Sequence, residues 1–398
     1  MITDHQIGEI RTPAYIFDID VLGSRIKMIR EHLGDKIRLV YAIKANPFLV
    51  RPLIPLVDAF EVCSPGEEVI CRRAGVPGKM LVLSGVNKEK ANFDEIMDRY
   101  GADPVYTVES EQQMEMLSGL AEEKDIHVRV YLRLSGGSQF GMDESVLRKI
   151  TRDPGRFPNL DISGLHYFTG TQKKPKRIRR ELEKLEGLLA DPEFTGDGGM
   201  PELEYGPGLA VSYFPGEHEP DEEGALADLR TWLDHLQYGG RITLEMGRFI
   251  AASCGSYATG VADLKENDGT HYCIVDGGIH QVNYYGQNMA MKIPGIRVLR
   301  RDGAGEVRPV PTEEDAPGCT VCGSLCTTAD VLVREWKAPK LQIHDILVFE
   351  KTGAYAVTEG ISLFLSRDLP RIYLSQGGCL SMIRDKIKTE DLNDGTFD

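Results

Sequence analysis

The chain has 398 residues, a length that suits two domains, one of them large enough to be a barrel of more than about 200 residues. Hydrophobic residues make up 41% and charged residues 27% of the chain, and these ordinary globular values exclude a disordered or fibrous protein. The formal net charge of −15 leaves no domain-wide basic surface, which excludes nucleic acid as the main partner.

The chain begins with a candidate strand and then alternates strands with helices. The segment PAYIFDID (13–20) is expected to pair with the second domain. From about residue 36 to 246, short β-branched runs alternate with helix-like stretches, which is typical of β-α units around a parallel sheet. The predicted strands are residues 37–43, 57–62, 80–85, 104–108, 127–134, 161–168, 202–206 and 241–246. Helices are predicted at 65–75, 88–101, 110–124 and 177–190, where apolar residues recur every three or four positions.

This order of elements predicts an α/β fold with a closed (β/α)8 barrel, because an open sheet seldom needs so many parallel strands. We assign the barrel to residues 26–248. After about residue 250 the pattern changes to short strands separated by turns, at 255–264, 271–277, 296–300, 329–336, 345–350 and 370–375. Residues 1–25 and 249–398 are therefore expected to form a mainly β domain.

A basic cluster lies at the start of the last predicted barrel helix. It contains Lys173, Lys174, Lys176, Arg177, Arg179 and Arg180. The plainer interpretation is a solvated helix face. The alternative is a docking patch for an acidic partner such as a carrier protein.

Targeting and metal signals are weak. Residues 1–20 lack an apolar segment after basic residues, and no run of about 18 apolar residues occurs, so we expect neither export nor membrane contact. The eight cysteines are scattered without a small disulfide framework, which favours a cytoplasmic location. Cys319, Cys322 and Cys326 lack a fourth ligand at a recognisable spacing, so no metal site is expected.

Reactive side chains follow many of the predicted barrel strands, whose C-terminal ends carry the active site in this architecture. Together they supply an amine, carboxylates, an aromatic ring, a hydroxyl, glycines and a guanidinium, the groups that a phosphorylated aromatic aldehyde requires. They are Lys44, Ser64, Glu67, Arg133, Gln139, His166, Phe168, Thr171, Gly206, Gly208, Glu245, Gly247 and Arg248.

Lys44 is the candidate for covalent attachment of such an aldehyde. We expect apolar surroundings from Tyr41, Ala42 and Ile43 to depress the pKa of its amine and allow a Schiff base to form. A single lysine taken alone is more simply a surface residue.

Four residues are candidates for the phosphate. The backbone N–H groups at Gly206 and Gly208 can approach a phosphate closely, and Thr171 and Arg248 add a hydroxyl and a charge. A glycine pair alone is weak evidence.

Two further residues are candidates for the aromatic ring. Glu245 would face the pyridine nitrogen and keep it protonated, unless it forms a surface salt bridge. Phe168 would stack on the ring, unless it is simply part of the core.

Six segments carry a resemblance to a known family. They are YAIKANP (41–47), EVCSPGE (61–67), GLHYFTGTQ (164–172), EMGRFIA (245–251), CGSLCTTAD (322–330) and GAYAV (353–357). In this order they resemble the motifs of fold-type III pyridoxal 5′-phosphate (PLP) decarboxylases, the diaminopimelate and ornithine decarboxylase superfamily. The resemblance implies a PLP cofactor, an alanine-racemase-like barrel with a C-terminal β domain, and a head-to-tail homodimer with shared active sites.

The resemblance also implies roles for individual residues. Lys44 matches the Schiff-base lysine, Glu245 matches the partner of the pyridine nitrogen, and Thr171 and Arg248 match phosphate contacts. In the second domain, Cys326 matches the cysteine that the partner subunit inserts to protonate the decarboxylated product. Asp330 matches a substrate-side carboxylate, and Tyr355 a tyrosine near the phosphate.

The chain departs from the family pattern at three places. The glycine-rich turn contains Pro207, which removes one backbone donor. Phe168 stands where common relatives have a stacking histidine. Segment 275–292 lacks the Arg-Pro pair that grips the far end of diaminopimelate, and is more similar to the specialised-metabolism branch that includes the butirosin glutamyl-carrier-protein decarboxylase.

These departures guide the expected substrate. We expect Arg133, Tyr284, Tyr285 and Asp330 to contact an amino acid, free or carrier-tethered, that is not meso-diaminopimelate. The positive charge that would bind a far carboxylate in place of the absent Arg-Pro pair could come from Arg297 or Arg300. A PLP-dependent racemase is the alternative enzyme, although it would need a tyrosine base where CGSLCTTAD carries a cysteine. A non-catalytic homologue that acts as a binding regulator is the alternative outside enzymes.

Overall fold

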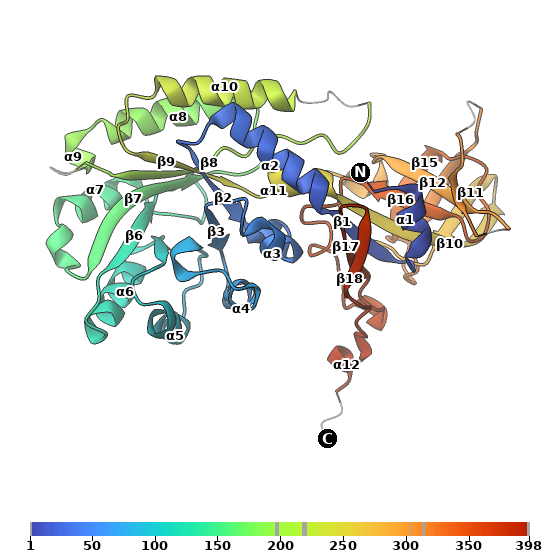
Figure 1. The fold of residues 1–398 in the computed structure, drawn as a ribbon, viewed down its shortest axis with the longest axis horizontal. Coiled ribbons are helices and arrows are strands. Elements are labelled where there is room, and N and C mark those ends of the chain that lie inside the picture. The colour runs from blue at the N-terminus through green and yellow to red at the C-terminus, as the bar shows by residue number, and fades with distance from the viewer. Residues whose placement is uncertain (1, 196–198, 217–220, 304, 313–314, 396–398) are drawn as a thin grey trace. The chain divides into compact units, whose positions relative to one another are not determined.

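The structure, a computed structural model, describes residues 2–195, 199–216, 221–303, 305–312 and 315–395 (Figure 1). Within these ranges the chain forms two compact units. The barrel unit contains residues 25–211 and 221–250, and the β unit contains residues 2–24, 212–216 and 251–395.

Eight parallel strands close into a barrel, which confirms the predicted α/β barrel fold. Each strand pairs with the next along the chain, and the last pairs with the first, with Val40 opposite Glu245. The strands are β2 (Arg38–Ala42), β3 (Ala59–Val62), β4 (Leu81–Leu83), β5 (Val105–Val108), β6 (Val128–Arg133), β7 (Leu160–Phe168), β8 (Glu202–Gly206) and β9 (Arg241–Met246). Every predicted barrel strand overlaps one of them.

Helices alternate with these strands and surround the barrel (Figure 1). They are α2 (Ile19–Leu33), α3 (Val50–Leu53), α4 (Pro65–Ala74), α5 (Lys90–Tyr100), α6 (Glu111–Glu123), α7 (Glu144–Arg152), α8 (Pro175–Leu189), α9 (Pro192–Thr195), α10 (Glu222–His235) and α11 (Arg248–Ala251). The four predicted helices match α4, α5, α6 and α8, while α2, α7 and α10 were not singled out from the sequence.

Local sequence explains where the helices begin and end, as α4 illustrates. The Ser64 hydroxyl accepts a hydrogen bond from the Glu67 backbone N–H, and Pro65 occupies the first turn, where no N–H is needed. The helix ends at Gly75, whose φ of +88° is left-handed. These limits place residues 61–64 at the C-terminal end of β3, where the active site is expected.

The β unit is a ten-stranded sheet built from both ends of the chain. Its strands are β1 (Ala14–Asp18), β10 (Gly255–Asn267), β11 (Thr270–Val275), β12 (Ile296–Arg301), β13 (Val307–Pro309), β14 (Gly318–Cys322), β15 (Val331–Lys337), β16 (Ile346–Glu350), β17 (Arg371–Gln376) and β18 (Cys379–Arg384). The short helices α1 (Asp4–Glu9) and α12 (Glu390–Asn393) accompany it. Strand β1 lies between β10 and β17, which confirms that the N-terminal strand pairs with this sheet.

The core of the β unit joins residues that are far apart in the sequence. Ile7, Ile16, Ala258, Leu299 and Val348 are fully buried in one hydrophobic cluster. Among the described helices, none is long and apolar enough to cross a membrane.

Candidate active site

Lys44 lies in a single 3-10 turn, η1 (Ile43–Ala45), directly after β2. Its Nζ is 2.5 Å from Glu61 Oε2 and 3.3 Å from Glu245 Oε1. The prediction of apolar surroundings for the amine is therefore wrong. Tyr41, Ala42 and Ile43 are buried, but the Lys44 amine lies beside carboxylates of β3 and β9 instead of apolar side chains.

The pKa values of the two carboxylates beside Lys44 are shifted in opposite directions. Burial alone would raise the pKa of Glu245, but the charge of Lys44 and the hydrogen bonds of Glu61 and Lys44 outweigh it and lower the pKa below its usual value. Burial and the charge of Glu245 raise the pKa of Glu61. Glu245 is therefore the stable anion of the site, which is the state needed to hold a proton on a pyridine nitrogen.

His166 adds a neutral ring to this cluster. Burial lowers its pKa to about 3, so the ring stays uncharged at neutral pH. Its Nε2 is 3.1 Å from Glu245 Oε2, and because Glu245 is ionised, Nε2–H donates to it. His166 therefore fixes the direction of the Glu245 carboxylate without adding charge.

Glu204 is buried on β8 next to this cluster without a hydrogen-bond partner among the described residues. Its Oε1 is 4.0 Å from His166 Nε2. Burial, followed by the charges of Glu245 and Glu61, raises its pKa well above the usual value. The environment of Glu204 therefore favours its protonated form in the folded protein.

Changing Glu204→Gln should stabilise the protein increasingly as pH rises. Above about pH 4.5 the unfolded chain releases the Glu204 proton while the folded chain keeps it, so the wild type loses about 1.4 kcal/mol per pH unit up to the folded-state pKa. A neutral glutamine carries no such cost. Urea unfolding at pH 5, 6, 7 and 8 should show a variant-minus-wild-type difference that grows with pH.

The exposed Asp161→Asn change on β7, which also removes one carboxylate from the barrel, is the control measured alongside it. A Glu204→Gln difference that does not vary with pH beyond the control would show that Glu204 is ionised in the folded protein.

The segments that follow β7, β8 and β9 lie close together, and we call the turn Gly206–Pro207–Gly208 with Thr171 and Arg248 beside it the glycine cradle. Only glycine fits at two of its positions. A Cβ added at Gly206 would lie 2.3 Å from the Phe168 ring, and one at Gly208 would lie 2.2 Å from the Gly170 carbonyl oxygen. The φ of Gly208 is +60°, a left-handed value that other residues rarely adopt. Nearby, Arg248 Nε donates to Thr171 Oγ1 over 3.3 Å. The structure thus brings together the four residues predicted to bind phosphate.

Phe168 lies between this cradle and the lysine. Its ring centroid is 5.7 Å from Lys44 Nζ, and its ring also faces Gly206. An aromatic ring held between the amine and the glycine turn offers a flat apolar face to a bound heteroaromatic ring.

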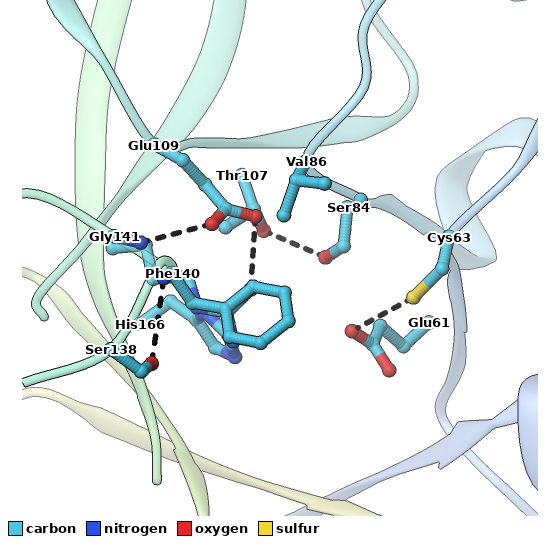
Figure 2. A network of polar contacts seen from close by, with 12 residues as sticks. Glu61, Cys63, Ser84, Val86, Thr107, Glu109, Ser138, Phe140, Gly141 and His166 are labelled. Atoms are coloured by element: carbon cyan, nitrogen blue, oxygen red, sulfur yellow. Dashed lines mark hydrogen bonds and ion pairs between the residues drawn. The ribbon is translucent and has the colours of Figure 1, made fainter. Parts of the chain in front are cut away.

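The ends of β5 and β6 carry a buried ion pair between Glu109, which Figure 2 shows beside Gly141, and Arg133. Arg133 NH1 donates to Glu109 Oε1 over 2.9 Å, and Glu109 Oε2 accepts from the Gly141 backbone N–H. The Arg133 guanidinium also lies 4.8 Å from the Phe140 ring centroid. Because Glu109 and Phe140 engage it, Arg133 holds the loop before α7 in place, and its contact with a substrate stays a prediction.

The other predicted site residues belong to the β unit. Cys326 is exposed, and Tyr355 is partly buried. Asp330 is buried, and its two oxygens accept hydrogen bonds from the Ile279 and Leu325 backbone N–H groups. Asp330 therefore shapes the loop that carries Cys326.

The two tyrosines predicted to bind substrate differ in exposure. Tyr284 is buried against Tyr213 and Phe214, and its hydroxyl donates to the Glu350 carbonyl oxygen. Tyr285 is 47% exposed. Of this pair, Tyr285 has the ring surface that a ligand can reach.

Sequence reasoning placed Glu245 at the barrel mouth but missed Glu61, the other acidic neighbour of the lysine. Glu61 lies opposite Ala42 in the β2–β3 register, which places its side chain beside Lys44. Cys63 Sγ is 3.3 Å from Glu61 Oε1 and 3.7 Å from Lys44 Nζ, and Figure 2 shows it directed at Glu61. Acidic residues inside otherwise apolar barrel strands, as in AFEV and ELEYG, were the available signal.

Comparison with known proteins agrees with this geometry. A family model described as "Pyridoxal-dependent decarboxylase, C-terminal sheet domain" matches residues 14–353. The chain belongs to this family. Its enzymes are PLP-dependent amino-acid decarboxylases, so PLP is the cofactor and decarboxylation the reaction class of this chain.

Characterised relatives span almost the whole chain. The chain is 26% identical to diaminopimelate decarboxylase of Aquifex aeolicus, over 94% of this chain and 89% of that protein. It is 27% identical to L-glutamyl-[BtrI acyl-carrier protein] decarboxylase of Niallia circulans, over 96% of this chain and 92% of that protein.

Solved structures agree on the fold. The crystal structure of AQ1208 from Aquifex aeolicus has a TM-score of 0.82 at 26% identity, covering 96% of this chain and 90% of that one. Diaminopimelate decarboxylase from Helicobacter pylori, complexed with L-lysine, has a TM-score of 0.83 at 22% identity, with 97% of both chains covered. These comparisons confirm the predicted family and fold.

The barrel mouth fits PLP. The amine of Lys44, the anionic Glu245 and a glycine cradle beside Arg248 match an aldehyde, a pyridine nitrogen and a phosphate in turn. A Cβ at Gly206 or Gly208 would strike the Phe168 ring or the Gly170 carbonyl oxygen, so only glycine lets the turn after β8 lie this close to the segment after β7, beside Thr171 and Arg248.

Proposed function

We propose that this enzyme removes the α-carboxyl group of an amino acid, free or tethered, whose far end is not a second amino-acid group. The observation that carries the proposal is Lys44 held between Glu61 and Glu245, across Phe168 from the glycine cradle. When bound, PLP supplies an electron sink for the carbanion left by CO2.

The barrel residues each have a proposed duty. Lys44 would bind the cofactor covalently and give way to the substrate amine, and Glu245 would hold a proton on the pyridine nitrogen. Arg248 and Thr171, with the backbone of Gly206 and Gly208, bind the phosphate, and Phe168 covers one ring face. His166 keeps Glu245 oriented.

The β-unit residues complete the proposal. We propose a cytoplasmic homodimer in which the partner subunit supplies Cys326 to return a proton to the substrate carbon, with Asp330 and Tyr355 lining the same site. Exposure of Cys326 supports this role, because a proton donor must reach the substrate.

The cations suggested for the far carboxylate of diaminopimelate are engaged elsewhere. Arg297 pairs with Asp4 and Glu350, and Arg300 pairs with Asp345. Segment 280–285 itself supplies no arginine or lysine: His280 and Gln281 are buried, and the ring of Tyr285 is exposed. Such a surface favours a substrate with a neutral, amidated or extended far end, because an unmatched buried carboxylate costs several kcal/mol, ~3 or more.

A tethered substrate is favoured by the basic cluster at the start of α8. Lys174, Lys176 and Arg180 are exposed and have no ion-pair partner among the described residues. No acidic residue occupies the first turn, although a helix N-terminus favours anions, so the cluster works against the stability of its own helix. Helix α8 follows β7, whose end carries Phe168, so an acidic carrier bound to these cations would deliver its tether to the barrel mouth.

A steady-state comparison of CO2 release tests the substrate. The panel is meso-diaminopimelate, L-lysine, L-ornithine, L-glutamate and L-glutamate loaded on an acyl-carrier protein. We expect kcat/KM for meso-diaminopimelate to be at least about tenfold below the best substrate. If meso-diaminopimelate gave the highest kcat/KM of the panel, the proposal would be contradicted. Arg367 lies near His280. If the Arg367→Gln change then removed the activity with meso-diaminopimelate, Arg367 would be the residue that binds its far carboxylate.

A further inference from the structure

The loop after β7 and the turn after β8 are joined through Lys173 and its neighbour. The Lys173 backbone N–H donates to the Gly208 carbonyl oxygen over 2.9 Å, and its Nζ donates to the Gly206 carbonyl oxygen over 3.0 Å. Gln172 makes two hydrogen bonds to Val211 of the same segment. Its Nε2 donates to the Val211 carbonyl oxygen, and its Oε1 accepts from the Val211 N–H. Both glycine carbonyls of the cradle are thus held by one residue.

The side chain of Lys173 is fully buried, and Glu181 of α8 makes that burial possible. Glu181 Oε2 is 2.7 Å from Lys173 Nζ, and Glu181 also accepts from the Tyr205 hydroxyl and the Thr169 hydroxyl. The Lys173 amine lies 5.6 Å from the Phe168 ring centroid and 5.4 Å from that of Tyr205. A buried ammonium needs such a partner, and this one is anchored by residues on both sides of the cradle.

The turn needs an external support because of its own sequence. Pro207 has no N–H, so the turn has one donor fewer for itself or for an anion. In a trans peptide the carbonyl oxygen and the N–H point in opposite directions. Since the Gly208 oxygen faces Lys173, the Leu209 N–H of the same peptide points to the opposite side, where an anion can accept from it.

We propose that Lys173, held by Glu181, is a positioning residue for the cofactor phosphate. It fixes the turn Gly206–Pro207–Gly208 in the conformation that presents backbone N–H groups, and so compensates for the donor lost at Pro207. Lys173 does not contact the phosphate, because its amine is fully buried and bonded to Glu181 and Gly206. The inference rests on the proposed cofactor site of the barrel.

Binding of two cofactor forms to the full-length apoenzyme tests the inference. PLP carries the phosphate and pyridoxal lacks it, and the visible absorbance gained on binding reports the affinity of each. The double variant Lys173→Met/Glu181→Gln removes both charges together, because a lone buried charge would unfold the chain more readily. The control is Lys184→Met, an exposed lysine on α8. Lys173→Gln is the second variant: its amide keeps a donor for Gly206 and Glu181, and Arg177 still pairs with Glu181.

We expect the double variant to bind PLP at least about tenfold more weakly than the wild type, with less than about twofold change for pyridoxal. Lys173→Gln should show the same selectivity at about threefold or more, and Lys184→Met neither effect. Unchanged PLP affinity in a folded variant, or equal losses for PLP and pyridoxal, would overturn the positioning role. A wild-type chain that gains no visible absorbance with PLP would instead overturn the cofactor site itself.

Discussion

Changing Lys44→Ala should abolish turnover and the visible absorbance of bound cofactor. We expect kcat to fall by ~10³-fold or more, because the covalent anchor and the exchange with the substrate amine are both lost. The amine is partly exposed, so its removal leaves no large cavity, and the fold should survive. Absorbance of the purified variant with added PLP, together with CO2 release, measures both effects.

The control is Lys36→Ala, an exposed lysine that precedes the N-terminal end of the same barrel strand. It should keep both absorbance and turnover. If Lys44→Ala retained the visible band of covalently bound cofactor, another lysine would be the anchor. Lys88 would then be the next residue to test, because burial lowers its pKa to about 8 and it also follows a barrel strand.

Mixing two inactive variants should restore part of the activity. In a homodimer with shared sites, Lys44→Ala and Cys326→Ala subunits form hybrids that contain one intact and one doubly defective site. Half of randomly mixed dimers are hybrids, so we expect about one quarter of wild-type activity from a mixture of two nearly inactive proteins. The measurement is CO2 release before and after subunit exchange by dilution or mild denaturant.

Two controls make the mixing experiment decisive. Each variant taken alone through the same exchange should stay inactive, and a tagged pair should show by affinity capture that hybrids have formed. Hybrids that form and remain inactive would show that Lys44 and Cys326 act within one chain.

The barrel was predictable because its strands and helices recur as a regular pattern in the sequence. Eight β-branched runs separated by helical patterns specify a parallel sheet whatever the side chains do at its mouth. Helix α10 was not predicted, although Leu226, Leu229 and Leu233 in EEGALADLRTWLDH form its buried face at helical spacing. Strand β14 was not predicted, because its residues include Cys319 and Cys322, which were considered only as metal ligands. Its pairing with β15 is also irregular.

The site was predictable only in part, for a physical reason. Lys44, Glu245 and the glycine pair stand at strand ends, and the barrel geometry alone brings strand ends together. The partners of Lys44 and Lys173 depend on register and side-chain direction across neighbouring elements, as Glu61 and Glu181 show. Such pairs form only in the folded chain, and no repeating pattern in the sequence indicates them.

The mixed origin of the β sheet has a consequence for synthesis on the ribosome. Strand β1 is made first, yet its partners β10 and β17 begin at residues 255 and 371. At about 5–20 residues per second, β1 waits roughly 12–50 s for β10 and longer for β17. During that interval the whole barrel emerges and can fold, while an apolar strand with two unpaired edges stays attached to it. The nascent chain therefore carries its own aggregation-prone segment until nearly the last strand is complete.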